Sequence, residues 1–186
     1  MAPWFAVAML AAFSACVQPH GFDPAEHFEF RLIDGGAAVE ITGYVGGRAD
    51  VRIPSHIQGL PVAAIGVSAF QGGSFQEVPP GSQYFEWVPV THPIYSVSIP
   101  SGVTYIADAA FSGNYLSKVI IPYGVTHIGI AAFQVNSITR VTIPSSVAHI
   151  GRGAFALNRL TSVTIPYSVT YIGPWAFDDD VAIVRR

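Results

Sequence analysis

The stretch that decides the fold is residues 158–177, NRLTSVTIPYSVTYIGPWAF, because its apolar positions recur upstream at a fixed step. The Ile-Pro pair at 165–166 also occurs at 143–144, 121–122 and 99–100, which is a step of 22 residues. A repeat this short cannot bury its own apolar face, so the copies are expected to stack as a solenoid with one coil per repeat. Five more columns keep this step: Phe111, Phe133, Phe155 and Phe177; Val103, Val125, Val147 and Val169; Ile106, Ile128, Ile150 and Ile172; Val97, Val119, Val141 and Val163; and Ile94, Leu116, Ile138 and Leu160.

Apolar and polar residues alternate within one coil, which predicts two short strands. Residues 162–165 alternate, so that Val163 is expected on the inner face. Pro166 then ends the strand, because proline lacks a backbone donor. Residues 170–173 predict a second strand, in which Thr170 is expected to point inward. The recurring asparagines are interpreted as structural, since a buried Asn can satisfy backbone groups of turns in successive coils: they are Asn114, Asn136 and Asn158.

The repeats are predicted over residues 53–177, between two caps. Ile53-Pro54 opens an earlier and looser copy, and extra residues form an insertion at about 76–93. Residues 28–52 predict an N-terminal β-hairpin cap that turns through Asp-Gly-Gly. Residues 178–186 predict a C-terminal cap strand and tail, which covers an otherwise exposed edge.

The repeat Asn-x-Leu-Thr-Ser-Val-Thr-Ile-Pro-x-Ser-Val-Thr-x-Ile-Gly-x-x-Ala-Phe resembles the BspA or Treponema type of leucine-rich repeat found in bacterial surface proteins. The resemblance covers about residues 40–177, and its motifs are specific for a fold rather than for a site. It implies a β-rich, right-handed leucine-rich-repeat solenoid. Short parallel strands would lie on the concave face, with short second strands and 3-10 turns elsewhere. It also implies protein binding or surface attachment as the usual role, and not an enzyme.

The amino end has the layout of an export signal. Residues 4–13 are apolar and too few to span a bilayer, and small residues follow them. Phe13-Ser14-Ala15-Cys16 resembles a lipobox, although Phe stands where Leu is usual and no Lys or Arg precedes the apolar run. Residues 1–15 are therefore predicted as a lipoprotein-like signal peptide, Cys16 as the lipidation site, and 16–27 as a linker. The alternative is a buried terminal segment with a free cysteine.

Composition and motifs exclude several classes of function. The net charge is −3 and Lys118 is the only lysine, which leaves no basic footprint for nucleic acid. The single cysteine excludes a disulfide framework and a cysteine-based zinc site. No catalytic motif accompanies the six histidines, so no catalytic residue and no cofactor is predicted.

His127 and His149 occupy equivalent positions in neighbouring coils, so their rings are expected about 5 Å apart. Two imidazoles can bind a metal, but Tyr105 and Tyr171 complete the column and supply no obvious further ligand. A stacked aromatic stripe on the surface is the preferred interpretation, and no metal site is predicted.

Three surfaces are candidates for protein binding. The strand face is polar and carries one adjacent pair of cations. The aromatic stripe has polar tips of the kind that suit interfaces. The insertion carries aromatic residues, which either project for recognition or pack down on the solenoid flank. The candidate residues are Lys118 and Arg140; Tyr105, His127, His149 and Tyr171; and Tyr84, Phe85 and Trp87.

These observations predict an exported, lipid-anchored protein that binds a host or envelope macromolecule, in the manner of an adhesin. The partner is expected to be a protein, the membrane is reached through the lipid anchor, and a monomer is expected. The location is expected to be the outer membrane, the cell surface or the periplasm, as for spirochaetal lipoproteins. A periplasmic structural or envelope scaffold is the alternative, and a glycan-binding module is a third hypothesis.

Overall fold

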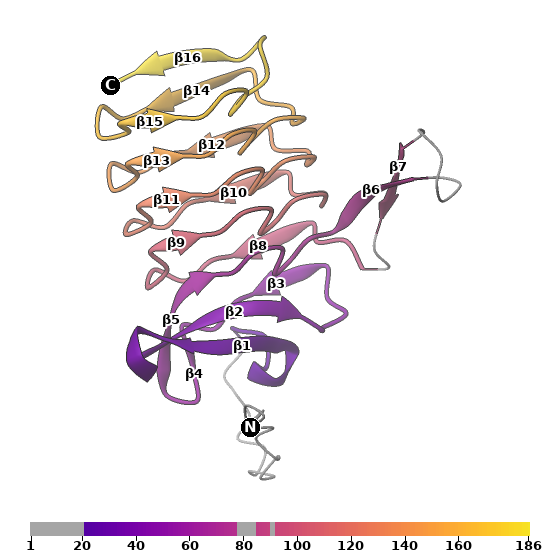
Figure 1. Cartoon of the computed structure of the whole chain (residues 1–186), viewed down its shortest axis with the longest axis vertical. Helices are drawn as coiled ribbons and strands as arrows, with labels where there is room; N and C mark the ends of the chain where they lie inside the picture. The colour runs from indigo at the N-terminus through magenta and orange to yellow at the C-terminus, as the bar shows by residue number, and fades with distance from the viewer. Residues whose placement is uncertain (1–20, 78–84, 90–91) are drawn as a thin grey trace, which may run out of the picture.

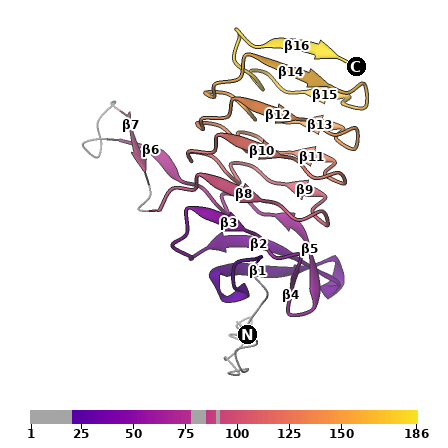
Figure 2. The same ribbon diagram turned by 180° about the vertical axis from the view of Figure 1, so that it is seen from behind.

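The structure is a computed structural model, and it describes residues 21–77, 85–89 and 92–186. Coils stack along one long axis, with the N-terminal cap at one end and the last strand at the other (Figure 1). Two columns of short strands run along the stack, one on each side of a continuous apolar core (Figures 1 and 2). The fold is therefore the solenoid that the 22-residue columns predict.

A mainly antiparallel cap closes the N-terminal end. β1 and β2 pair antiparallel, and Val39 and Ile41 of β2 are fully buried. The described 3-10 helices, η1 and η2, lie in this cap, whereas the corners of the coils are single turns. The elements from the cap through the first, looser coil are η1 (Ala25–His27), β1 (Phe28–Ile33), η2 (Asp34–Gly36), β2 (Ala38–Tyr44), β3 (Asp50–Arg52), β4 (His56–Ile57) and β5 (Leu60–Ile65).

One side of the solenoid is an eight-stranded sheet in the order β1-β2-β5-β9-β11-β13-β15, with β4 beside β5. Its repeat strands are parallel, and His127 pairs in register with His149. The repeat strands are β9 (Tyr105–Ile106), β11 (His127–Ile128), β13 (His149–Ile150) and β15 (Tyr171–Ile172).

The other side consists of the first strand of each coil. These strands pair in parallel as β3 with β8, β10 with β12, and β14 with β16. The insertion forms a separate antiparallel hairpin of β6 and β7, which projects from the stack (Figure 1). The strands are β6 (Gly73–Glu77), β7 (Phe85–Pro89), β8 (Ser96–Ser98), β10 (Lys118–Ile120), β12 (Arg140–Thr142), β14 (Ser162–Ile165) and β16 (Ala182–Arg185).

Phenylalanine rings form a continuous stack through the core. Neighbouring centroids are 5.0 to 5.4 Å apart, and the planes differ by 2 to 13°. The three middle rings are fully buried. The sequence predicts this spine, and the structure adds that it continues into the cap, where Phe70 contacts Tyr44 at 5.7 Å and Phe28 at 6.3 Å. The spine is Phe70, Phe111, Phe133, Phe155 and Phe177.

The asparagine column links each coil to the one before it. The Asn136 Oδ1 accepts a hydrogen bond from the Leu116 N–H at 3.0 Å, and its Nδ2 donates to the Phe111 carbonyl at 2.9 Å. Asn114 and Asn158 make the equivalent bonds. The structural interpretation of these residues is therefore confirmed, because they satisfy backbone groups that the apolar core would otherwise leave unpaired.

The prediction that Thr170 points inward is wrong. Thr170 is exposed, as are Thr104 and Thr126, and each hydroxyl donates to a carbonyl of the preceding coil at 3.1 to 3.2 Å. The second strand is only two residues long, so inward positions lie three residues apart, as at Val169 and Ile172, rather than two. Alternation cannot be extended across the turn that precedes such a strand.

Candidate functional site

Four aromatic side chains form a ladder on the second-strand sheet. Tyr105, His127, His149 and Tyr171, hereafter the aromatic ladder, are register partners on β9, β11, β13 and β15. Successive ring centroids are 5.8, 5.5 and 4.4 Å apart. Tyr105 is 44% exposed and Tyr171 is 48% exposed. The parallel register alone produces this ladder, because equivalent residues in parallel strands lie one strand spacing apart.

Stacking determines which part of the aromatic ladder a partner can reach. The rings of His149 and Tyr171 are 13° from parallel, and those of His127 and His149 are 25° from parallel. The faces of the inner rings therefore cover one another, and solvent meets their polar edges. Between its two ends, the ladder therefore presents polar ring edges rather than open ring faces.

The imidazole of His127 is also held from the side. Its Nδ1 lies 2.9 Å from the Thr126 Oγ1, and that hydroxyl donates to the Thr104 carbonyl at 3.1 Å. A hydroxyl that donates its one proton elsewhere must accept from the ring, so the His127 Nδ1 donates to the Thr126 hydroxyl. Among the described residues, no three His, Cys, Asp or Glu side chains come together as metal ligands.

The first-strand face carries the predicted pair of cations. Lys118 and Arg140 are exposed register partners on β10 and β12. Ile120 lies two residues further along β10 on the same face and is 65% exposed. On β8, β12 and β14 the other exposed residues carry hydroxyl side chains: Ser96, Ser98, Thr142, Ser162 and Thr164.

The insertion lies partly outside the described residues. Tyr84 and Cys16, with the predicted signal peptide at 1–15, are not among them. Phe85 and Trp87 belong to β7, where Trp87 pairs with Phe75 of β6. The hairpin starts at Gly73, three residues before the start that the sequence predicts.

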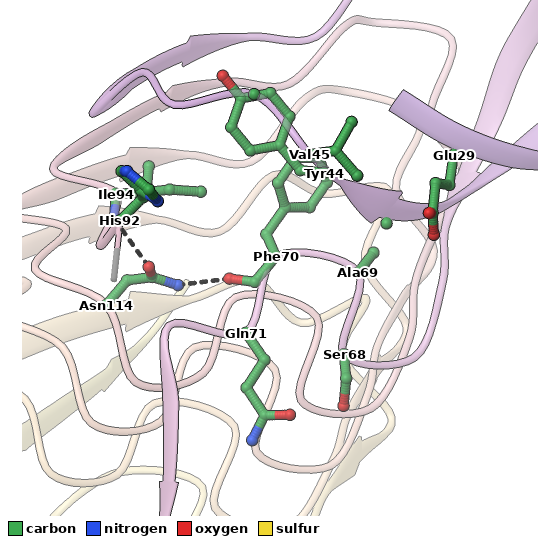
Figure 3. A pocket seen from close by; sticks show the side chains of 12 residues that line it. Glu29, Tyr44, Val45, Ser68, Ala69, Phe70, Gln71, His92, Ile94 and Asn114 are labelled. Atoms are coloured by element: carbon green, nitrogen blue, oxygen red, sulfur yellow. Dashed lines mark hydrogen bonds between the residues drawn. The ribbon is translucent and has the colours of Figure 1, made fainter. Parts of the chain in front are cut away.

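A pocket of about 370 Å³ lies where the cap meets the first coils (Figure 3). The Tyr44 and Phe70 rings lie side by side in it (Figure 3). The Asn114 carboxamide also lines it and donates a hydrogen bond to the Phe70 carbonyl (Figure 3). Glu29 and His92 also line it. Sequence reasoning missed this pocket, because its residues come from segments far apart in the chain.

The Tyr44 hydroxyl is the unusual polar group near this pocket. Its oxygen is buried, and no residue that the structure describes makes a hydrogen bond of good geometry with it. Burial raises the pKa of Tyr44 above its ordinary value, and the Asp23 carboxylate adds to the effect. The backbone and the charge of Arg48 lower the pKa of Tyr44, but by less than burial raises it. Asp23 is itself held by Arg48 at 3.2 Å and by the Arg52 amide at 2.6 Å. The position therefore favours a neutral phenol.

Trp175 is a second feature that sequence reasoning missed. It is 68% exposed and has φ of 54°, the left-handed conformation that bulky residues rarely adopt. The equivalent positions in other coils share this conformation but carry small residues: Ser68, Ala109, Ala131 and Gly153. Alignment of the repeats would therefore have shown Trp175 as the one large residue in this column. The exposed ring and the strained backbone make Trp175 a candidate contact position.

Within the part of the chain that the structure describes, no helix has the length and apolar character needed to cross a bilayer.

Comparisons with known proteins agree with the geometry. Residues 81–184 match the family model described as BspA type leucine rich repeat region, in six copies. The leucine-rich repeat protein of T. pallidum (TpLRR) superposes with a TM-score of 0.62 at 25% identity, over 89% of this chain and 83% of that one. A leucine-rich repeat protein of Bacteroides ovatus gives 0.65 at 24% identity, over 86% of this chain and 40% of that one. No curated protein matches the chain.

Proposed function

Because the chain belongs to the BspA-type leucine-rich repeat family, we propose that it is an exported, lipid-anchored module that binds a protein on a host surface or in the cell envelope. The observation that carries the proposal is the aromatic ladder, an ordered row of half-exposed rings with polar edges on a rigid sheet. Tyr and His edges supply hydrogen bonds at little cost in side-chain entropy, because stacking already restricts the rings.

The export part of the proposal rests on residues 4–16. An apolar run followed by small residues and one cysteine supports acylation at Cys16. Labelling of intact cells with a membrane-impermeant reagent tests the location, and metabolic labelling with a fatty acid tests Cys16→Ser against the parent. Protection from external protease until the outer membrane is ruptured would favour the periplasmic scaffold and contradict adhesion.

The binding part is tested with matched tyrosine variants. Tyr105→Ser with Tyr171→Ser removes both ends of the aromatic ladder, while Tyr123→Ser with Tyr167→Ser removes two exposed tyrosines from another column. A partner captured by crosslinking on the cell surface should bind the first variant at least tenfold more weakly and the second with unchanged affinity. Equal affinity of the two variants would overturn the assignment of the ladder.

A further inference from the structure

The cationic pair on the first-strand face does not stabilise the fold of the free protein. Lys118 and Arg140 are directly opposite each other on adjacent parallel strands, which lie about 4.8 Å apart. Like charges in such cross-strand positions destabilise a sheet. The equivalent positions in the flanking coils carry Ser96 and Ser162, so the repeat itself does not require a cation here.

Among the residues that the structure describes, no carboxylate forms an ion pair with Lys118 or Arg140. Residues 109–177 contain four cations, Lys118, Arg140, Arg152 and Arg159, and no Asp or Glu. Asp50 is the acidic residue on the described strands of this face, and it lies on β3, two strands from Lys118. The described ion pairs both lie in the N-terminal cap. The central coils are therefore locally cationic in a chain whose net charge is −3.

The apolar neighbour of the pair narrows the choice of ligand. Ile120 is 65% exposed and follows Lys118 by two residues, so the two side chains lie about 7 Å apart on one face. An extended peptide repeats its same-side residues at about the same distance. A sulfated glycan would find only two adjacent cations and an apolar side chain here, which is a poor match for a polyanion.

We propose that Lys118, Arg140 and Ile120 together bind an extended segment of a partner protein in which an Asp or Glu precedes an apolar residue by two positions. The carboxylate lies between the ammonium and the guanidinium, and the apolar side chain covers Ile120. The hydroxyls of Thr142 and Ser162 flank the segment and can bond to its backbone. This inference rests on the proposed role in protein binding and names the partner chemistry of a second face.

The test is a titration of the isotope-labelled full chain with the end-blocked peptide Gly-Ser-Glu-Ser-Leu-Ser-Gly, followed by amide chemical shifts. The shifts should change on β10 and β12, and the affinity should fall as salt is added. Replacing Glu by Gln, or Leu by Ser, in the peptide should each weaken binding about fivefold. Shift changes confined to the other sheet, or equal binding of the Gln peptide, would overturn the proposal.

The protein variants restore the residue found in the neighbouring coils. Lys118→Ser with Arg140→Ser should abolish peptide binding, and its thermal midpoint at low salt should be unchanged or higher, because a repulsion is removed. Arg152→Ser with Arg159→Ser, which removes two exposed cations that lie outside the strands, is the matched control for this double variant and should bind as the parent does.

Two further outcomes separate the proposals. Tyr105→Ser with Tyr171→Ser should bind the peptide normally, so failure of the aromatic ladder as a binding site leaves this result intact. Heparin that binds the parent but not the Lys118/Arg140 variant, together with no peptide binding, would assign the face to a glycan and refute the inference.

Discussion

Asn136 joins two coils through one carboxamide. Its Oδ1 accepts from the Leu116 amide and its Nδ2 donates to the Phe111 and Phe133 carbonyls. Asn136→Ala would leave these buried groups unpaired, so we expect a loss of about 2–3 kcal/mol in the free energy of unfolding. Urea unfolding measures it, with Gln134→Ala as the neighbouring control at about 0.5 kcal/mol or less. Equal losses would show that the carboxamide bonds contribute little.

Tyr44 offers a test that depends on pH. Because its pKa is raised in the folded state, the folded protein keeps the phenol proton while the unfolded chain loses it above pH ~10. Stability is therefore unaffected at neutral pH and falls as pH rises past this value. Tyr44→Phe should remove the alkaline loss and change stability at pH 7 by about 1 kcal/mol or less, since the hydroxyl is unpaired. Urea unfolding midpoints of the parent and of Tyr44→Phe, measured from neutral pH to above pH ~10, test this prediction.

At the scale of elements, the phenylalanine spine and the aromatic ladder use the same kind of side chain differently. Phe133 is fully buried between two parallel rings, whereas Tyr105 lies at the open end of its stack. Phe133→Ala should cost about 3–5 kcal/mol, and Tyr105→Ala about 1 kcal/mol or less. Calorimetry of the two variants provides the comparison, and similar losses would mean that the two faces are assigned wrongly.

The close approach of second strands depends on glycine. A Cβ on Gly151 would lie 2.6 Å from backbone atoms of Gly129 and Ile130, whereas a Cβ on Gly153 meets its nearest neighbour at 3.6 Å. Gly151→Ala should therefore cost about 3 kcal/mol through overpacking. Gly153→Ala should cost about 1 kcal/mol, because φ of 62° is tolerated by Ala131 in the preceding coil. Denaturant midpoints that fall in the reverse order would contradict this account.

The sequence was sufficient wherever the repeat itself carries the information. The 22-residue step predicted the register of His127 on His149 and the burial of the Phe133 column. The prediction from alternation was wrong for Thr170, because the second strand is only two residues long and alternation does not extend beyond it. The pocket beside Tyr44 could not be predicted from the sequence, because its lining comes from the cap, the first coil and the end of the insertion, which are far apart in the chain.

At the scale of the whole molecule, the hairpin of β6 and β7 is separable from the stack. Deleting residues 73–91 restores between Phe70 and Ile94 the five-residue spacing that separates Phe111 from Leu116. Gly73 pairs with Pro89, so the two ends of the hairpin already lie together. The deletion variant should unfold cooperatively with a midpoint close to the parent's. Loss of cooperativity, seen by circular dichroism, would show that the hairpin is part of the folding unit.

Each coil meets its neighbours through the same three contacts: a strand edge, a phenylalanine face and an asparagine carboxamide. A duplicated coil would therefore find on both sides the neighbours that it left, and a lost coil would leave two surfaces that already match. Unequal recombination between repeats can thus add or remove one coil at a time, and the protein produced at each step is expected to fold. The number of coils, and with it the length of the surface available to a partner, can then change more readily than the fold.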